Sequence, residues 1–170
     1  MKKEKLRIVL ILITSFIAIV IVSFTVGREW YEGKSQSLTS FGLIHFSGYL
    51  FFFLMPVEMA FVYYLSYFRG AELIGVAMAT AVVAQVIDYL IGLLVSKQII
   101  QKLVSEKSIL KAEKYIRKFG NLTIFLFNVL PLSSPVIVLT AGIMKFSFRN
   151  LMIYSISGLF FKYLILSLIF

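Results

Sequence analysis

The chain has 170 residues, of which 60% are hydrophobic and 15% are charged, and its formal net charge is +9. A soluble globular domain contains roughly 45–50% apolar residues, so the composition excludes an ordinary soluble fold. The absence of cysteine excludes disulfides and cysteine-ligated metals, and the single His45 cannot build a histidine cluster. Because the bases lie beside hydrophobic runs, we attribute the positive charge to membrane topology and anionic lipid head groups, not to nucleic acid.

The hydrophobic residues are concentrated in long uninterrupted runs. These cover residues 8–26, 41–68, 71–95, 122–144 and 151–170. A helix needs about 20 apolar residues to cross a bilayer core of about 30 Å, and only helices and closed barrels satisfy their backbone in lipid. The runs lack the period-two alternation of barrel strands. The sequence therefore predicts an all-α integral membrane protein.

The first run, 8–26, follows a basic N-terminus and resembles a signal peptide. Its apolar stretch is longer than a cleaved signal requires, and residues 26–29 (Val-Gly-Arg-Glu) form a poor cleavage site. We therefore expect residues 1–40 to form a retained signal-anchor helix and an external loop, with the N-terminus in the cytoplasm.

The second run, 41–68, carries Pro56 and Glu58 at its centre, where proline removes a helix hydrogen bond. It could form one kinked helix or a re-entrant hairpin. Loop 96–121 holds seven bases and two acids, which places it in the cytoplasm by the positive-inside rule. The helix expected at 71–95 delivers that loop to the cytoplasm only if run 41–68 enters and leaves by the external face. We therefore predict a re-entrant hairpin at 41–68.

The basic segment 97–119 is typical of an amphipathic cytoplasmic helix on the membrane surface. Its apolar side chains fall on one face, at Ile109, Ala112, Ile116 and Phe119. Gly120 suits the position just past the helix end. The alternative is an ordinary cytoplasmic connector.

The run 122–144 is also broken at its centre. The interrupting residues are Asn128, Pro131, Ser133, Ser134 and Pro135. The run begins at the basic loop and ends at Lys145 and Arg149, so we predict a second re-entrant hairpin that opens to the cytoplasm, followed by a transmembrane helix at 151–170. Residues 41–170 then contain two units of opposite orientation, an arrangement typical of transporters with broken helices.

Three ionisable residues lie inside apolar runs, where a charge costs about 2.5–3.5 kcal/mol and marks a functional candidate. They are Glu58, Asp88 and Lys162. Glu58 would occupy the first turn of a half-helix, as a protonatable gate, a head-group contact or a structural cap. Asp88 and Lys162 are expected to form an ion pair, which would serve structure or transport equally well.

Ser133-Ser134-Pro135 is a good helix start, with serine at the N-cap and proline at the first helical position. Together with Asn128, this buried helix end could hold a phosphate head group, or it could be only a satisfied turn. The chain has no nucleophile elbow, zinc-protease motif, acidic cluster or glycine-rich nucleotide loop. We therefore expect no enzymatic activity, no cofactor and no metal.

The stretch from about residue 45 to 165 resembles the DedA family, also called VTT or SNARE-associated-Golgi-like membrane proteins. The matching features are Pro56-x-Glu58, Asp88-Tyr89-x-Ile91-Gly92, the segment 111–120, Pro131, Ala141-Gly142 with Met144, and Gly158. The resemblance implies two opposed re-entrant hairpins and movement of lipids between leaflets. Bacterial and archaeal members are linked to polyprenyl-phosphate or phospholipid translocation, some of them dependent on the proton-motive force, and eukaryotic relatives behave as scramblases.

The sequence departs from the family at the second hairpin. Many bacterial members carry arginines three positions before and after the hairpin proline, where this chain has Asn128 and Ser134. The acidic residues are kept, so we expect a neutral head-group site built from helix ends, Asn128 and serines. The leading hypothesis is a plasma-membrane lipid scramblase or lipid-phosphate translocase, with proton coupling through Glu58 and Asp88. The alternatives are a small-solute or ion transporter on the same scaffold and a non-transporting assembly factor. The few spans leave room for a homo-oligomer.

Overall fold

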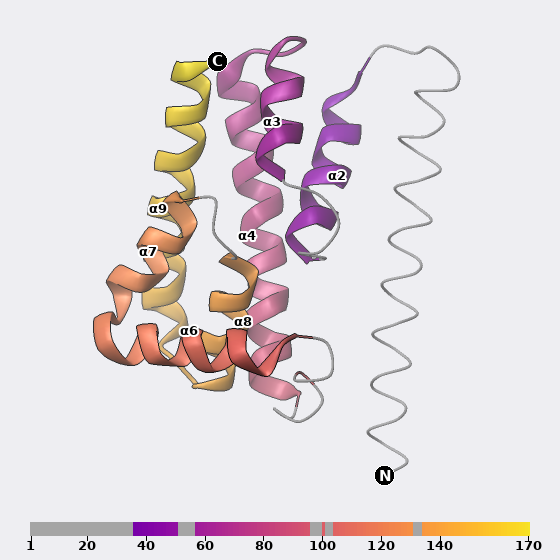
Figure 1. Ribbon diagram of the computed structural model, residues 1–170. Coiled ribbons are helices and arrows are strands. Elements are labelled where there is room, and N and C mark those ends of the chain that lie inside the picture. Colours follow the sequence, from indigo (N-terminus) through magenta and orange to yellow (C-terminus); the bar gives the residue numbers. More distant parts are fainter. Residues whose placement is uncertain (1–35, 51–56, 96–99, 101–103, 131–133) are drawn as a thin grey trace, which may run out of the picture.

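The computed structural model describes residues 36–50, 57–95, 100, 104–130 and 134–170. These residues form helices, with no strand among them, so the all-α prediction is confirmed for this part of the chain (Figure 1). The helices are α2 (Leu38–Leu50), α3 (Val57–Leu65), α4 (Gly70–Leu94), α6 (Glu106–Phe119), α7 (Asn121–Val129), α8 (Ser134–Ile143) and α9 (Phe148–Ile169). The helix expected at 8–26 lies outside the described residues, as do Pro56, Pro131 and Ser133.

Two of these helices, α4 and α9, are long and apolar enough to cross a membrane. They contain 25 and 22 residues. At about 1.5 Å per residue they measure roughly 38 and 33 Å, against a bilayer core of about 30 Å. They match the spans predicted at 71–95 and 151–170 to within three residues at each end. They run antiparallel and in contact, with Gly70 at the start of α4 beside Ser167 near the end of α9.

The four shorter apolar helices form two pairs that lie toward opposite ends of α4 and α9 (Figure 1). Helices α2 and α3 pack on each other, and each contacts α4. Helices α7 and α8 also pack on each other, with α7 against α9 and α8 against α4. Each of the four contains between 9 and 13 residues. At most about 20 Å long, none of them can cross a bilayer core alone.

Glycines set the distance between the helices at two contacts. A Cβ added at Gly92 of α4 would overlap the carbonyl oxygen of Leu139, and one at Gly142 of α8 would overlap that of Tyr89. A Cβ at Gly158 of α9 would overlap the backbone of α7 in the same way. Small residues allow the close backbone approach that drives helix association in lipid. These glycines therefore hold α8 on α4 and α7 on α9.

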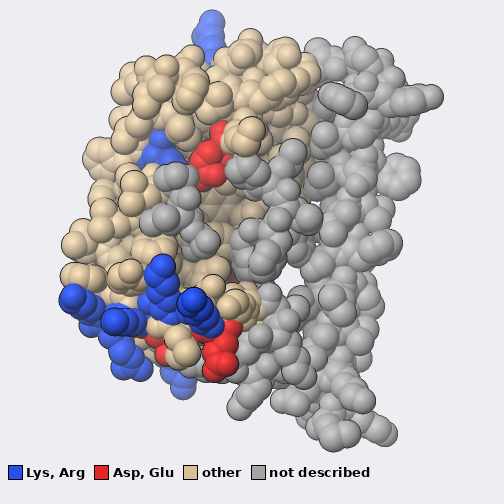
Figure 2. All heavy atoms as spheres, in the orientation of Figure 1, with Lys and Arg blue, Asp and Glu red and all other residues tan. Residues whose placement is uncertain are grey.

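Helix α6 crosses the end of the bundle where α4 ends and α9 begins (Figure 1). Its apolar residues Ile109, Ala112 and Ile116 are buried, and its last turn carries Arg117 and Lys118. Gly120 follows with φ of 53° and turns the chain into α7. Figure 2 shows the basic side chains of this face gathered where α6 lies. Of the amphipathic helix predicted at 97–119, the helix α6 is observed from Glu106 to Phe119, so it begins nine residues later than predicted, after Ser105 at its N-cap.

Candidate functional site

An ion pair lies inside the apolar bundle. Lys162, in the middle of α9, donates from Nζ to Oε1 of Glu58 at 2.9 Å. Lys162 is 4% exposed and Glu58 is 23% exposed. Among the described residues, Lys162 is the only buried lysine or arginine. Glu58 lies in the first turn of α3, as predicted, where the positive end of the helix dipole favours a carboxylate.

Aromatic side chains surround the lysine of this pair. Nζ of Lys162 donates a second hydrogen bond, of 2.9 Å, to the hydroxyl of Tyr49 on α2. It also lies 5.5 Å from the ring centroid of Tyr49 and 5.3 Å from that of Tyr163. A cation at this distance is attracted to the electron-rich ring face. The buried ammonium is therefore compensated by one carboxylate, one hydroxyl and two rings.

A chain of hydrogen bonds continues from Tyr49 to the only histidine. The hydroxyls of Tyr49 and Tyr163 are 3.1 Å apart. The Tyr163 hydroxyl lies 2.5 Å from Nε2 of His45, which is fully buried. Nδ1 of His45 lies 2.8 Å from the hydroxyl of Thr80 on α4. The chain thus joins α2, α4 and α9 through side chains alone.

The direction of this chain follows from Thr80. Its hydroxyl donates to the carbonyl of Val76 at 2.8 Å, so its oxygen accepts the Nδ1 proton of His45. Nε2 then accepts from Tyr163, whose oxygen accepts from Tyr49. The oxygen of Tyr49 accepts from Lys162, so each hydroxyl and the ring N–H of the chain donates to an acceptor.

A second polar cluster links α4, α7 and α9 nearer the other end of the bundle. Asn128 of α7 is fully buried and accepts a hydrogen bond of 2.5 Å from Nε2 of Gln85. Its own amide nitrogen donates to the carbonyl of Ile124 at 2.8 Å and to the hydroxyl of Ser155 at 3.2 Å. At the position of a family arginine, this chain therefore holds a satisfied neutral amide.

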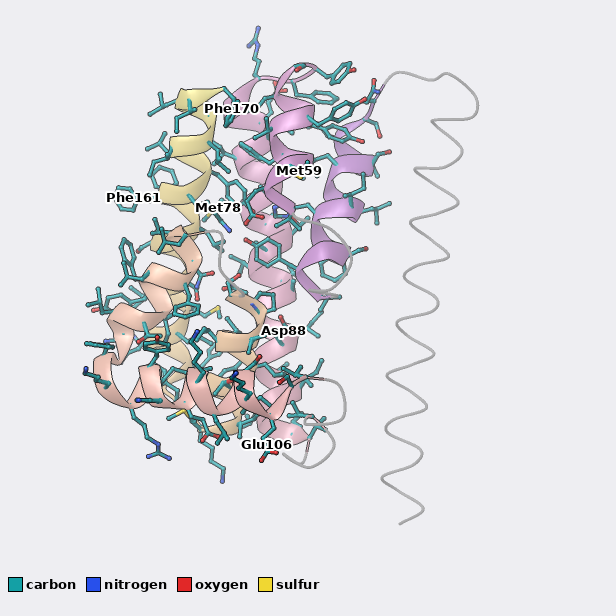
Figure 3. All side chains as sticks on the ribbon, viewed as in Figure 1. Met59, Met78, Asp88, Glu106, Phe161 and Phe170 are labelled. Carbon is teal, nitrogen blue, oxygen red and sulfur yellow. The ribbon has the colours of Figure 1, made fainter. Side chains whose placement is uncertain are left out.

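Asp88 lies on α4 beside α8 (Figure 3) and is 2% exposed. Its Oδ2 and the Oε1 of Gln85 have no hydrogen-bond partner among the described residues. The two residues are three positions apart, so they share one face of α4. The described residues contain no group of three or more His, Cys, Asp or Glu that could hold a metal. The site therefore offers two buried acceptor oxygens that no described residue donates to.

The expected ion pair between Asp88 and Lys162 is wrong, since Lys162 pairs with Glu58. The reason is the antiparallel register in which Gly70 meets Ser167. Asp88 lies eighteen residues below that level on α4, and Lys162 lies only five residues below it on α9. At a rise of about 1.5 Å per residue, the backbone positions of Asp88 and Lys162 are separated by about 20 Å along the bundle.

The predicted helix start after the second break is observed one residue early. Helix α8 begins at Ser134, and both Ser134 and Pro135 are buried. Ser134, the N-cap expected before Pro135, is thus the first helical residue, and Ser133 lies outside the described residues. Glu58 and Lys162 come together, whereas Asn128 belongs to the second cluster and Asp88 lies three residues after its member Gln85 on α4.

Sequence reasoning missed Tyr49, Tyr163 and the hydrogen-bonding role of His45. One signal was present: His45 and Tyr49 are four residues apart, which puts two polar side chains on one face of an apolar helix. Tyr163 directly follows Lys162 in the sequence, so it adjoins a residue that was predicted for the site. Nothing in the local sequence indicated that these residues meet, because they are separated by more than 110 positions.

Comparison with known protein families matches the VTT domain to residues 38–170, which include every helix described above. Comparison with curated proteins and with solved structures gives no match. The matched range covers most of the chain and agrees with the resemblance inferred from the motifs. The chain therefore belongs to the VTT domain family, whose members are generally membrane proteins of the DedA type.

Proposed function

We propose that this protein moves lipids with phosphate-bearing head groups between membrane leaflets, as a scramblase or a lipid-phosphate translocase, without chemically converting them. The observation that carries the proposal is the buried pair of Lys162 and Glu58 within apolar helices of a membrane protein. Well-packed apolar residues are often as stabilising as a buried ion pair. Ionisable residues retained inside a membrane usually mark a substrate or proton path.

Lys162 supplies the cation that would recognise the phosphate. The family arginines are replaced at positions 128 and 134, so the base comes from α9 instead of the second hairpin. Glu58 is the exchangeable partner, because it is partly exposed and sits on the nine-residue helix α3. When a phosphate oxygen takes the place of Glu58, the ammonium keeps an anionic partner throughout. The acyl chains remain in lipid beside the exposed apolar side chains of α9.

Asp88 is proposed as the second protonatable group. A proton on its carboxyl group would allow it to donate to the unpartnered Oε1 of Gln85, three residues away on the same helix face. Loss of that proton would leave both oxygens as acceptors without a donor among the described residues. Head-group movement past this cluster would then be coupled to proton binding at Asp88.

We propose the topology that the charges predict. Helices α2 and α3 enter and leave by the external face, α7 and α8 by the cytoplasmic face, and the N-terminus lies in the cytoplasm of a plasma-membrane protein. The opposite placement of the two short pairs and the basic α6 support this arrangement. The chain contains no cysteine, so single cysteines at exposed Arg69 and Lys118 can be labelled separately. Labelling of both from the same side would refute the topology.

The function is tested by transbilayer movement of a fluorescent phospholipid in liposomes that contain the purified protein, with and without a pH gradient. We expect Lys162→Met and Glu58→Gln to slow movement about tenfold or more, because each removes a charge-assisted contact. The matched controls are Arg149→Met and Glu72→Gln, which alter exposed charges on α9 and α4. Equal rates for Lys162→Met and Arg149→Met would refute the proposal.

A small-solute or ion transporter is the second candidate, favoured by the two unpartnered oxygens of Asp88 and Gln85. Solute-dependent proton flux without lipid movement in the same liposomes would select it. A non-transporting assembly factor would instead lose its function on deletion of residues 97–118 and tolerate substitution of Glu58 and Asp88.

A further inference from the structure

A groove of about 550 Å³ lies between α6 and α7, with residues of α8 at its floor. This volume is within the range of about 300–1,000 Å³ that is typical of small-molecule sites. Thr123 ties the two walls together, because its hydroxyl donates to the carbonyl of Tyr115 at 2.8 Å. The ring centroids of Tyr115 and Phe127 lie 6.0 Å apart across the same corner. The groove is therefore a fixed feature of the turn at Gly120, and its lining does not include Lys162 or the residues that contact Lys162.

The two walls of the groove differ in polarity. The α6 wall presents Ser108, Lys111 and Tyr115, which are spaced three and four residues apart on one helix face. The α7 wall presents Leu122, Leu126 and Leu130, whose side chains are 51%, 42% and 46% exposed. These leucines extend about 12 Å along α7, at about 1.5 Å per residue. The groove thus has a cationic, hydroxyl-bearing edge and a long apolar wall.

The position of the groove matches this polarity. Helix α6 lies across the end of the bundle, and α7 runs from that end toward the middle of α9 (Figure 1). An amphiphile at the membrane surface has the same order of groups, an anionic head above an apolar tail. Helix α6 carries five bases and two acids, so its surface attracts anionic head groups.

We propose that this groove binds one anionic phospholipid, with its phosphate at Lys111 and Ser108 and one acyl chain along the leucines of α7. This lipid is resident and lies apart from the proposed transport path. Its binding anchors α6 against α7, and thereby fixes the corner from which the second short helix pair extends.

The test is native mass spectrometry of the purified full chain, which counts bound phosphatidylglycerol or phosphatidylcholine with identical acyl chains. We expect the wild type to retain one phosphatidylglycerol in preference to phosphatidylcholine. Lys111→Met should lower that preference about fivefold, as expected for one lysine close to an anionic head group. Lys114→Met is the matched control, since Lys114 lies on the same helix but faces away from the groove.

A second variant tests the apolar wall. Leu126→Trp places a larger side chain in the groove from a position that is 42% exposed, so the packed core is not disturbed. We expect it to abolish retention of both lipids without changing the thermal unfolding midpoint. Equal effects of Lys111→Met and Lys114→Met would show attraction to the basic surface only and overturn the proposal. Undiminished lipid binding by Leu126→Trp would overturn it as well.

Discussion

The buried pair of Glu58 and Lys162 makes a quantitative prediction about stability. Glu58→Gln leaves the ammonium of Lys162, which is 4% exposed, without a counter-charge. Breaking a buried pair costs about 3–5 kcal/mol. We expect about 3 kcal/mol here, because Glu58 is 23% exposed and Lys162 keeps its bond to Tyr49. That loss lowers the folding equilibrium constant about a hundredfold.

The reciprocal and double variants complete the cycle. Lys162→Met leaves a carboxylate that is partly hydrated and lies at the N-terminus of α3, so we expect it to cost only about 1–2 kcal/mol. The double variant removes both charges and should cost less than about 1 kcal/mol, because an apolar replacement of a buried pair is often neutral. The coupling free energy between the two sites is then at least about 3 kcal/mol.

The measurement is reversible denaturant unfolding in detergent micelles, followed by far-ultraviolet circular dichroism of the helices. The wild type, the two single variants and the double variant are compared under one set of conditions. Additive effects within about 0.5 kcal/mol would mean that the two residues do not interact. That result would refute both the ion pair and the transport role built on it.

Three further predictions concern the contacts between helices. Gly92→Ala should destabilise the fold by about 1–3 kcal/mol through overlap with Leu139, whereas Gly75→Ala, with open space around it, should stabilise it by about 0.5–1 kcal/mol. A shift of the unfolding midpoint in the same direction for both glycine variants would contradict this prediction. Asn128→Leu should cost about 1–3 kcal/mol by leaving Gln85 Nε2 unpaired, and the double variant Gln85→Leu, Asn128→Leu should recover part of that loss; a single variant as stable as the wild type would be inconsistent with the cluster. Tyr163→Phe should cost about 1–3 kcal/mol because it interrupts the chain from Tyr49 to His45. The exposed Tyr154→Phe on the same helix should change stability by less than about 0.5 kcal/mol, and equal shifts for the two tyrosines would disprove the chain.

The long helices could be predicted from the sequence for a local reason. Some 20 apolar residues in succession have few alternatives to a membrane helix. Helices α4 and α9 accordingly lie within three residues of their predicted bounds. The amphipathic helix α6 could also be predicted from the local sequence, because its buried residues Ile109, Ala112 and Ile116 recur at the helical period.

The candidate site was only half predictable. A charged residue inside an apolar run can be recognised from the sequence alone, and for this reason the sequence identifies Glu58, Asp88 and Lys162 as candidates. Their partners depend on how far each helix slides past its neighbours. The contact of Gly70 with Ser167 sets that register for α4 and α9 and leaves Asp88 about 20 Å from Lys162 along the bundle, whereas Lys162 meets Glu58 of α3.

By itself, the sequence determined that the protein is helical, that it is a membrane protein, and that three ionisable residues lie within its apolar runs, because each property depends on composition or short-range periodicity. The tertiary structure alone decided that Lys162 pairs with Glu58, that Tyr163 and His45 continue the chain, and that Gln85 meets Asn128. These contacts join residues between 43 and 118 positions apart. They exist because glycines allow particular backbones to approach, and that approach fixes which polar groups share the space between helices.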